Sequence, residues 1–133
     1  MKTFFFLLCV ITLNAIAHDF SGRYDCDGKD GSEGAYKGEV IMNLKKQFIQ
    51  KDYASYDFVL KVPGFGEYNG FAAANNLDVA IYFGLDDKQN EDYGVGIAKF
   101  SKTKNNLWQF HKFYFEPGYK GGNTGFEDCI QVK

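Results

Sequence analysis

The sequence predicts an all-β protein: an antiparallel eight-stranded up-and-down barrel closed by a disulfide between its first and last strands. Three observations support this prediction. Eight segments alternate apolar and polar residues and are joined by short, turn-forming connections. No stretch shows an apolar period of 3.6 residues over a helical length. Two cysteines, Cys26 and Cys129, lie near the two ends of the chain that follows a leader-like start.

The start of the chain has the three parts of a secretory signal peptide. Lys2 supplies a positive charge, a short apolar run follows over 4–11, and Ala15-Ile16-Ala17 is typical of a cleavage site. The apolar run is shorter than the ~20 residues that a membrane-spanning helix needs. We therefore expect a signal peptide at 1–17 and a single β-barrel domain at 18–133, exported to a periplasm or to the outside of the cell.

The first four predicted strands lie in the first half of this domain. In segment 19–26, aromatic, glycine and cysteine residues occupy the even-numbered positions and polar residues the odd-numbered ones, as in a half-buried strand. Segments 36–44 and 53–62 repeat the alternation with Val, Leu and Phe. Pro63-Gly64 then sets a tight turn, because proline fixes φ and glycine adopts positive φ. The fourth strand is predicted over 65–74.

The remaining four strands follow at similar spacing. Asn75-Asn76 is a two-residue hairpin signal, because asparagine tolerates the left-handed region. Segment 77–83 then alternates most regularly, with aliphatic and aromatic residues on one parity. Strands at 93–100, 107–115 and 125–132 complete the set. Eight short strands with short links favour a meander in which each strand pairs with its neighbour.

An even number of strands places the first and last antiparallel when the meander closes. A bond between Cys26 and Cys129 would then cross-link the seam, and an exported chain with two cysteines is expected to form it. Closure also removes the sheet edges that promote aggregation. A barrel of eight strands is either filled by its own side chains or holds one small ligand.

Charge and hydropathy limit the partners. The chain has 15 basic and 17 acidic residues, and the basic ones are scattered among acids. Nucleic acid is excluded as an expected partner, because it requires a concentrated basic face. No segment after the leader is long and apolar enough to span a membrane. The expected partner is a small apolar molecule or another protein.

Aromatic residues are the main candidates for ligand binding, since the chain has 14 Phe, 9 Tyr and one Trp. Aromatics are common in strands and in cores, so a purely structural role is the alternative. The number of tyrosines favours a pocket in which ring faces and hydroxyl groups meet a ligand. The predicted ligand-binding residues are Tyr24, Tyr56, Phe58, Tyr68, Tyr82, Trp108 and Tyr114.

Motifs for catalysis or metal binding are absent or incomplete. There is no G-x-S-x-G sequence, and both mature cysteines are assigned to the disulfide. The acidic segment 25–33 does not match an EF-hand, because Lys29 and Asp30 occupy its fifth and sixth positions. A remote alternative is copper binding by His18, as the mature N-terminus, together with His111. We expect a binding protein rather than an enzyme, and no cofactor.

Phe20-Ser21-Gly22-Arg23-Tyr24 resembles the G-x-W sequence that begins the first strand of calycin-like barrels, the lipocalins and avidins, with Tyr24 in place of Trp. The predicted meander of eight strands is similar to that architecture. The resemblance implies a cup whose open end holds a small, largely apolar ligand. In size, disulfide and export the chain also resembles small secreted barrel inhibitors of lysozyme-type hydrolases.

Two functional hypotheses follow. The first is an exported, non-enzymatic β-barrel binding module for a small apolar or aromatic ligand. The alternative is a secreted protein-interaction module, such as an inhibitor of an envelope or host hydrolase. It would act through rim loops at 27–35, 86–92 and 118–124, which are rich in glycine and charge.

Overall fold

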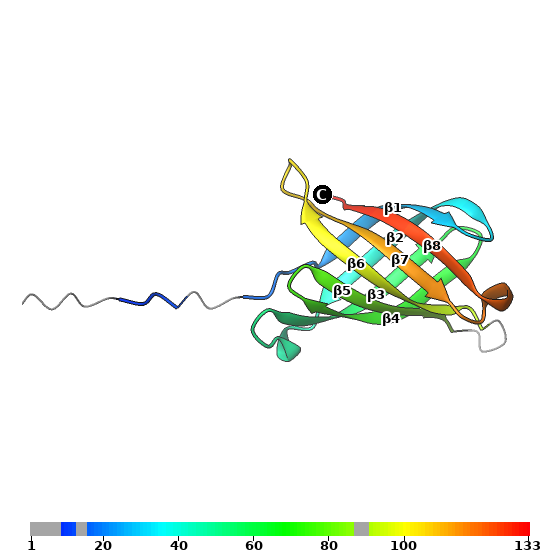
Figure 1. Cartoon of the computed structure of the whole chain (residues 1–133). Helices are drawn as coiled ribbons and strands as arrows, with labels where there is room; N and C mark the ends of the chain where they lie inside the picture. Colours follow the sequence, from blue (N-terminus) through cyan, green and yellow to red (C-terminus); the bar gives the residue numbers. More distant parts are fainter. Residues whose placement is uncertain (1–8, 13–15, 87–90) are drawn as a thin grey trace, which may run out of the picture.

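The chain folds into a closed barrel. A computed structural model describes residues 9–12, 16–86 and 91–133. Eight antiparallel strands follow one another in chain order, and the last pairs with the first (Figure 1). The predicted all-β class, barrel topology and strand number are confirmed. The strands are β1 Gly22–Asp30, β2 Gly34–Leu44, β3 Tyr53–Val62, β4 Gly66–Asn75, β5 Asp78–Leu85, β6 Tyr93–Lys102, β7 Trp108–Glu116 and β8 Asn123–Gln131.

Helical structure in the described part of the chain is limited to two 3-10 turns. These are η1 Lys46–Phe48 and η2 Tyr119–Gly121. Within that part, no helix has the length and apolar composition needed to cross a membrane.

The seam between β1 and β8 closes the barrel. Cys26 lies directly opposite Cys129 in the antiparallel register of these two strands, and a disulfide joins them. The predicted bond between the first and last strands is therefore confirmed. The cross-link connects residues that are 103 positions apart in the sequence, so it closes nearly the whole domain into one loop.

The structure differs from the sequence prediction at the first strand. The prediction was 19–26, whereas β1 begins at Gly22 and ends at Asp30. Residues 27–34, interpreted as a loop, mostly belong to strands, and the turn is confined to 31–33. Glycine and aspartate have low strand propensity, but pairing with β2 on one side and β8 on the other outweighs it.

One half of the barrel interior is filled by aromatic rings, and we call it the closed half. Phe20 precedes β1, and its ring stacks on Phe100 with centroids 4.1 Å apart. The Tyr24 hydroxyl donates to the Phe20 carbonyl at 2.7 Å, and the Tyr56 hydroxyl donates to the His18 carbonyl at 2.7 Å. These contacts hold the segment before β1 inside the barrel, where it fills this half of the interior. The buried aromatic residues of this half are Phe20, Tyr24, Tyr56, Phe100, Trp108 and Phe110.

The connections divide between the two ends of the barrel. Those at the closed end are 45–52, 76–77 and 103–107. Those at the opposite end, which we call the open end, are 31–33, 63–65, 86–92 and 117–122. Residues 87–90 lie outside the described part. The described residues of the three predicted rim loops thus lie at the open end, where η2 also lies (Figure 1).

Candidate binding site

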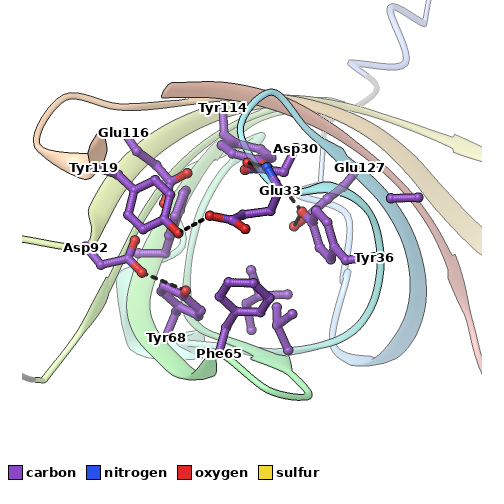
Figure 2. Close-up of a pocket in the computed structure, with 14 residues that line it drawn as sticks. Asp30, Glu33, Tyr36, Phe65, Tyr68, Asp92, Tyr114, Glu116, Tyr119 and Glu127 are labelled. Atoms are coloured by element: carbon purple, nitrogen blue, oxygen red, sulfur yellow. Dashed lines mark hydrogen bonds between the residues drawn. The ribbon is translucent and has the colours of Figure 1, made fainter. Parts of the chain in front are cut away.

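The interior of the barrel is hollow at the open end. The pocket there has a cavity volume of about 70 Å³, enough for several water molecules or a small polar group. It is lined by five carboxyl groups: Asp30, Glu33, Asp92, Glu116 and Glu127. It is also lined by four tyrosines (Figure 2): Tyr36, Tyr68, Tyr114 and Tyr119. The apolar part of the wall is made by Ala35, Leu60, Val62, Phe65 and Phe83.

Two of these tyrosines reach the pocket by lying across glycines of the neighbouring strand. Tyr36 is directly opposite Gly28, and Tyr114 is directly opposite Gly125. A Cβ atom on Gly28 would lie 2.1 Å from the Tyr36 ring, and one on Gly125 would lie 2.1 Å from the Tyr114 hydroxyl. Only glycine leaves room for these rings. The two hydroxyl oxygens are consequently 3.5 Å apart over the pocket.

Asp30 is the most fully hydrogen-bonded carboxylate of the pocket. Its Oδ2 accepts from the Tyr114 hydroxyl at 2.6 Å and from Asn123 Nδ2 at 2.8 Å. Its Oδ1 accepts from the backbone amides of Ser32 and Glu33, both at 2.9 Å. Burial opposes its ionisation, but these hydrogen bonds outweigh burial and lower the pKa of the Asp30 carboxyl below its usual value. Asp30 is therefore charged at neutral pH.

Asp92 and Glu116 form a buried carboxyl pair beside it. Asp92 is 7% exposed and Glu116 is 6% exposed. Asp92 Oδ2 accepts from the Tyr68 hydroxyl at 2.8 Å, whereas Asp92 Oδ1 is buried without a hydrogen-bond partner among the described residues. Burial, followed by the hydrogen bond and charge of Asp92, raises the pKa of Glu116 to about 8. Glu116 thus keeps its proton at neutral pH.

The floor of the pocket is a buried ion pair between Lys112 and Glu127. Lys112 Nζ lies 2.6 Å from Glu127 Oε2, and both side chains are fully buried. The Tyr36 hydroxyl donates to Glu127. Lys112 Nζ also faces aromatic rings, with centroids at 5.0 Å for Phe83 and 5.5 Å for Tyr114. The barrel interior therefore already holds one ammonium group between a carboxylate and ring faces.

The pocket has an excess of acidic groups. Lys112 pairs with Glu127, and Lys120 pairs with Glu33. The other three carboxyl groups have no cationic partner in the described ranges 9–12, 16–86 and 91–133, and we call them the unpaired carboxyl groups: Asp30, Asp92 and Glu116. Glu116 keeps its proton at neutral pH, so the negative charge without a cationic partner lies on Asp30 and Asp92. Because a cleft of low dielectric concentrates the field of one sign of charge, this end of the barrel attracts cations.

The predicted ligand-binding residues are spread over three regions. Tyr68 and Tyr114 line the pocket. Phe58 lies beneath it, with its ring centroid 5.3 Å from Lys112 Nζ. Tyr82 lies on the outer face of β5 and is 38% exposed. The other three are packed in the closed half: Tyr24, Tyr56 and Trp108.

Sequence reasoning did not name Tyr36, Tyr119 or any carboxyl group as a ligand-binding residue. A signal for two of the acids was present. Glu116 follows the buried Tyr114 by two residues, and Glu127 precedes the buried Cys129 by two. Side chains two positions apart on a strand share a face, so both glutamates point inward.

The two histidines lie in different surroundings. The His18 ring packs against Trp108 with centroids 5.2 Å apart, and it bonds to Asn76 at 2.8 Å. The His111 ring stacks on Phe126, and its Nδ1 lies 2.7 Å from Asp128. The residues that contact the His18 ring are thus different from those that contact the His111 ring. In the described part of the chain, the one group of three potential metal ligands is formed by Glu127 and the two cysteines, whose sulfurs are joined in the disulfide.

Comparisons with protein-family models, with curated proteins and with solved structures find no match for this chain. The fold and the site by themselves define a closed antiparallel β-barrel with a pocket of carboxyl groups and tyrosines at one end. The chemistry of that pocket is therefore the basis for assigning a function.

Proposed function

We propose that this protein is an exported, non-enzymatic binding module whose open end takes a small organic cation with an aromatic or apolar body. One observation carries the proposal: the unpaired carboxyl groups lie among four tyrosine rings in one pocket. The negative charge favours a cation, and the rings favour an apolar body. The sequence-based hypothesis of a small apolar or aromatic ligand thereby gains a requirement for positive charge.

An ammonium group suits the inner part of the pocket. It has only hydrogen-bond donors, and Asp92 is a buried acid, 7% exposed, without a cationic partner among the described residues. A hydrogen bond that involves a charged group contributes ~1.5–3 kcal/mol, and each favourable contact with a ring face adds ~0.5–2 kcal/mol. The burial of Lys112 Nζ beside Glu127 and three aromatic rings is an example of the same chemistry within the chain.

The size of the pocket places the rest of such a ligand at the mouth. A cavity volume of about 70 Å³ is below the ~300–1,000 Å³ of pockets that bury drug-sized molecules. The charged head would lie inside, and the apolar body would lie against Phe65, which is 44% exposed, and Tyr119. Figure 2 shows these two side chains at the pocket, on different sides of the carboxyl groups.

We expect phenethylamine, protonated at pH 7, to bind the protein more tightly than its neutral analogue 2-phenylethanol. The loss of one charged hydrogen bond corresponds to an affinity at least ~10-fold weaker for the alcohol. Asp92→Asn should weaken amine binding by a similar factor, because the amide is neutral and nearly the same size. Isothermal titration calorimetry measures all of these affinities.

Asp25→Asn is the matched control for this titration. Asp25 lies on the outer face of β1 and is exposed, so its substitution changes the net charge equally without touching the pocket. It should leave the affinity for phenethylamine unchanged. Equal affinities for the amine and the alcohol, or equal losses in the two variants, would contradict the proposal.

Glu116→Gln is expected to weaken the pH dependence of stability. The pKa of this carboxyl is about 8 in the folded chain against a reference value of 4.5, so the unfolded chain releases its proton at lower pH than the folded one. Its contribution to the unfolding free energy is complete below pH ~4.5 and is lost as the pH rises to ~8, by roughly 3–4 kcal/mol between pH 5 and pH 8. Urea denaturation at pH 5 and pH 8 should show this loss in the wild type and not in the variant, whose amide can still bond to Asn123 and Asp92. The same loss in both proteins would contradict the assignment.

A protein-interaction module is a second candidate, because described residues of each predicted rim loop line the pocket: Glu33, Asp92 and Tyr119. This candidate predicts that a protein is captured from an envelope or host lysate through these loops. Replacing 118–122 by a two-residue turn should then abolish capture. Unchanged capture by the shortened variant would count against it.

A further inference from the structure

The outer wall of the barrel carries two apolar rows that the pocket does not use. The strands β4 to β8 follow one another around the wall (Figure 1). In the first row, cross-strand neighbours are Phe71, Tyr82, Val95 and Phe115, one from each of β4, β5, β6 and β7. All four side chains are between 38% and 63% exposed.

The second row lies directly beside the first. Its cross-strand neighbours are Ala73, Ala80, Ile97, Phe113 and Phe126, one from each of β4 to β8. Ile97 is 67% exposed and lies near the middle of the row. The two rows together form one continuous surface, which we call the outer apolar surface.

The outer apolar surface is large for a monomer. Its seven large side chains are 38–67% exposed, and since such side chains present ~150–250 Å² each, they expose roughly 600–700 Å² together. The largest apolar patch of a typical monomer is ~300–600 Å² and is often functional. A standard protein interface buries about 800 Å² on each partner. The surface is thus close in area to one side of such an interface.

The opposite side of the barrel is different in character. Exposed ion pairs join Arg23 with Glu39 between β1 and β2, and Lys45 with Asp57 at β3. The apolar side chains are therefore concentrated on one side of the barrel. This distribution is typical of a surface that meets one partner from one direction.

We propose that the outer apolar surface is the interface of a homodimer, in which it packs against the same surface of a second copy of this chain. Its area is the first argument. Charge is the second, because the row beside it carries both signs: Asp78 pairs with Lys99 at 2.9 Å, and Asp128 lies 2.7 Å from His111. A border with both signs does not repel a copy of itself, and a two-fold axis can bring opposite charges together.

Shape is the third argument. A groove lies over the small residues Ala73 and Ala80 and is flanked by Ile97 and Phe113. A second copy presents the same raised side chains and the same groove. In the proposed homodimer, the two-fold axis places Ile97 of each copy opposite the groove of the other, which is an isologous arrangement.

Sedimentation equilibrium of the purified, disulfide-intact protein at micromolar concentration tests this proposal. The wild type should be a dimer, and Ile97→Lys should raise the dissociation constant by at least ~30-fold. Phe71→Lys is a second variant with the same expected direction. Phe48→Lys is the control, because Phe48 is 60% exposed and lies in η1 at the closed end; it should remain a dimer.

A wild type that stays monomeric at 100 μM would overturn the proposal. So would a monomer that binds phosphatidylcholine vesicles through Ile97, because the surface would then meet lipid. Circular dichroism and the thermal midpoint of each variant establish that a lysine on the outer wall leaves the barrel folded, so that a monomeric Ile97→Lys protein reports on the interface.

Discussion

Replacing Lys112 by methionine is expected to lower the free energy of unfolding by about 3–5 kcal/mol, since this is the cost of removing one partner of a buried ion pair. Lys112 and Glu127 are both fully buried and lie 2.6 Å apart at the floor of the pocket. Without the ammonium group, Glu127 keeps only the hydroxyl of Tyr36 as a donor among the described residues. A buried carboxylate in that state must either remain unpaired or take up a proton. Urea denaturation at pH 7 measures the loss.

The double variant Lys112→Met with Glu127→Gln separates the charge from the packing. Glutamine can still accept from the Tyr36 hydroxyl, and neither replacement carries a charge. Most of the stability lost in the single variant should therefore return. If the double variant is as unstable as the single one, packing rather than the unpaired charge is responsible, and the account of the pocket floor is wrong.

Removing the disulfide is expected to cost about 4 kcal/mol, because closing a loop of about a hundred residues lowers the entropy of the unfolded chain by roughly that amount in the chain-entropy model. The bond joins residues that are 103 positions apart. Cys26→Ala with Cys129→Ala should still fold, since β1 remains paired with β8 along the rest of the seam. Its unfolding midpoint in urea should fall while the transition stays cooperative.

Reduction of the wild type provides the comparison for this variant. Both routes remove the same cross-link, but only the variant also removes the two sulfur atoms from the core. The two proteins should lose similar amounts of stability, with the variant slightly less stable. A variant as stable as the oxidised wild type would show that the seam does not depend on the bond.

The fold could be predicted because alternation and short turns leave few arrangements for eight strands. The cysteine positions then fixed which strands meet at the seam. The boundary of β1 could not be predicted in the same way. Residues 27–30 have little intrinsic preference for a strand, and they are held by pairing with both β2 and β8, which sequence propensity does not register.

The site was harder to predict because apolar residues lie on both faces of several strands. On β7, Tyr114 points inward while Phe113 and Phe115 belong to the outer apolar surface. On β5, Phe83 points inward and Tyr82 outward. A period of two then indicates a strand without showing which parity is the interior.

The acids of the pocket were hidden for a related reason. Glu116 and Glu127 point into the barrel. A charged residue in a sequence is normally taken to be exposed, because burying it requires partners. Those partners, Lys112 and Asn123 among them, come from other positions in the barrel and meet the acids only in the folded chain. The sequence shows many tyrosines and scattered basic residues. It does not show that tyrosines and acids line the same pocket.

The most direct test of the proposed binding site is an NMR titration of the protein, labelled with ¹³C in its tyrosine rings, with phenethylamine at pH 7. The account predicts shifts for the tyrosines that line the pocket, Tyr36, Tyr68, Tyr114 and Tyr119. Tyr24 and Tyr56 are buried in the closed half and serve as internal controls that should not move. Shifts confined to the outer Tyr53 and Tyr82, or no shift at any tyrosine, would contradict a cation-binding pocket at the open end.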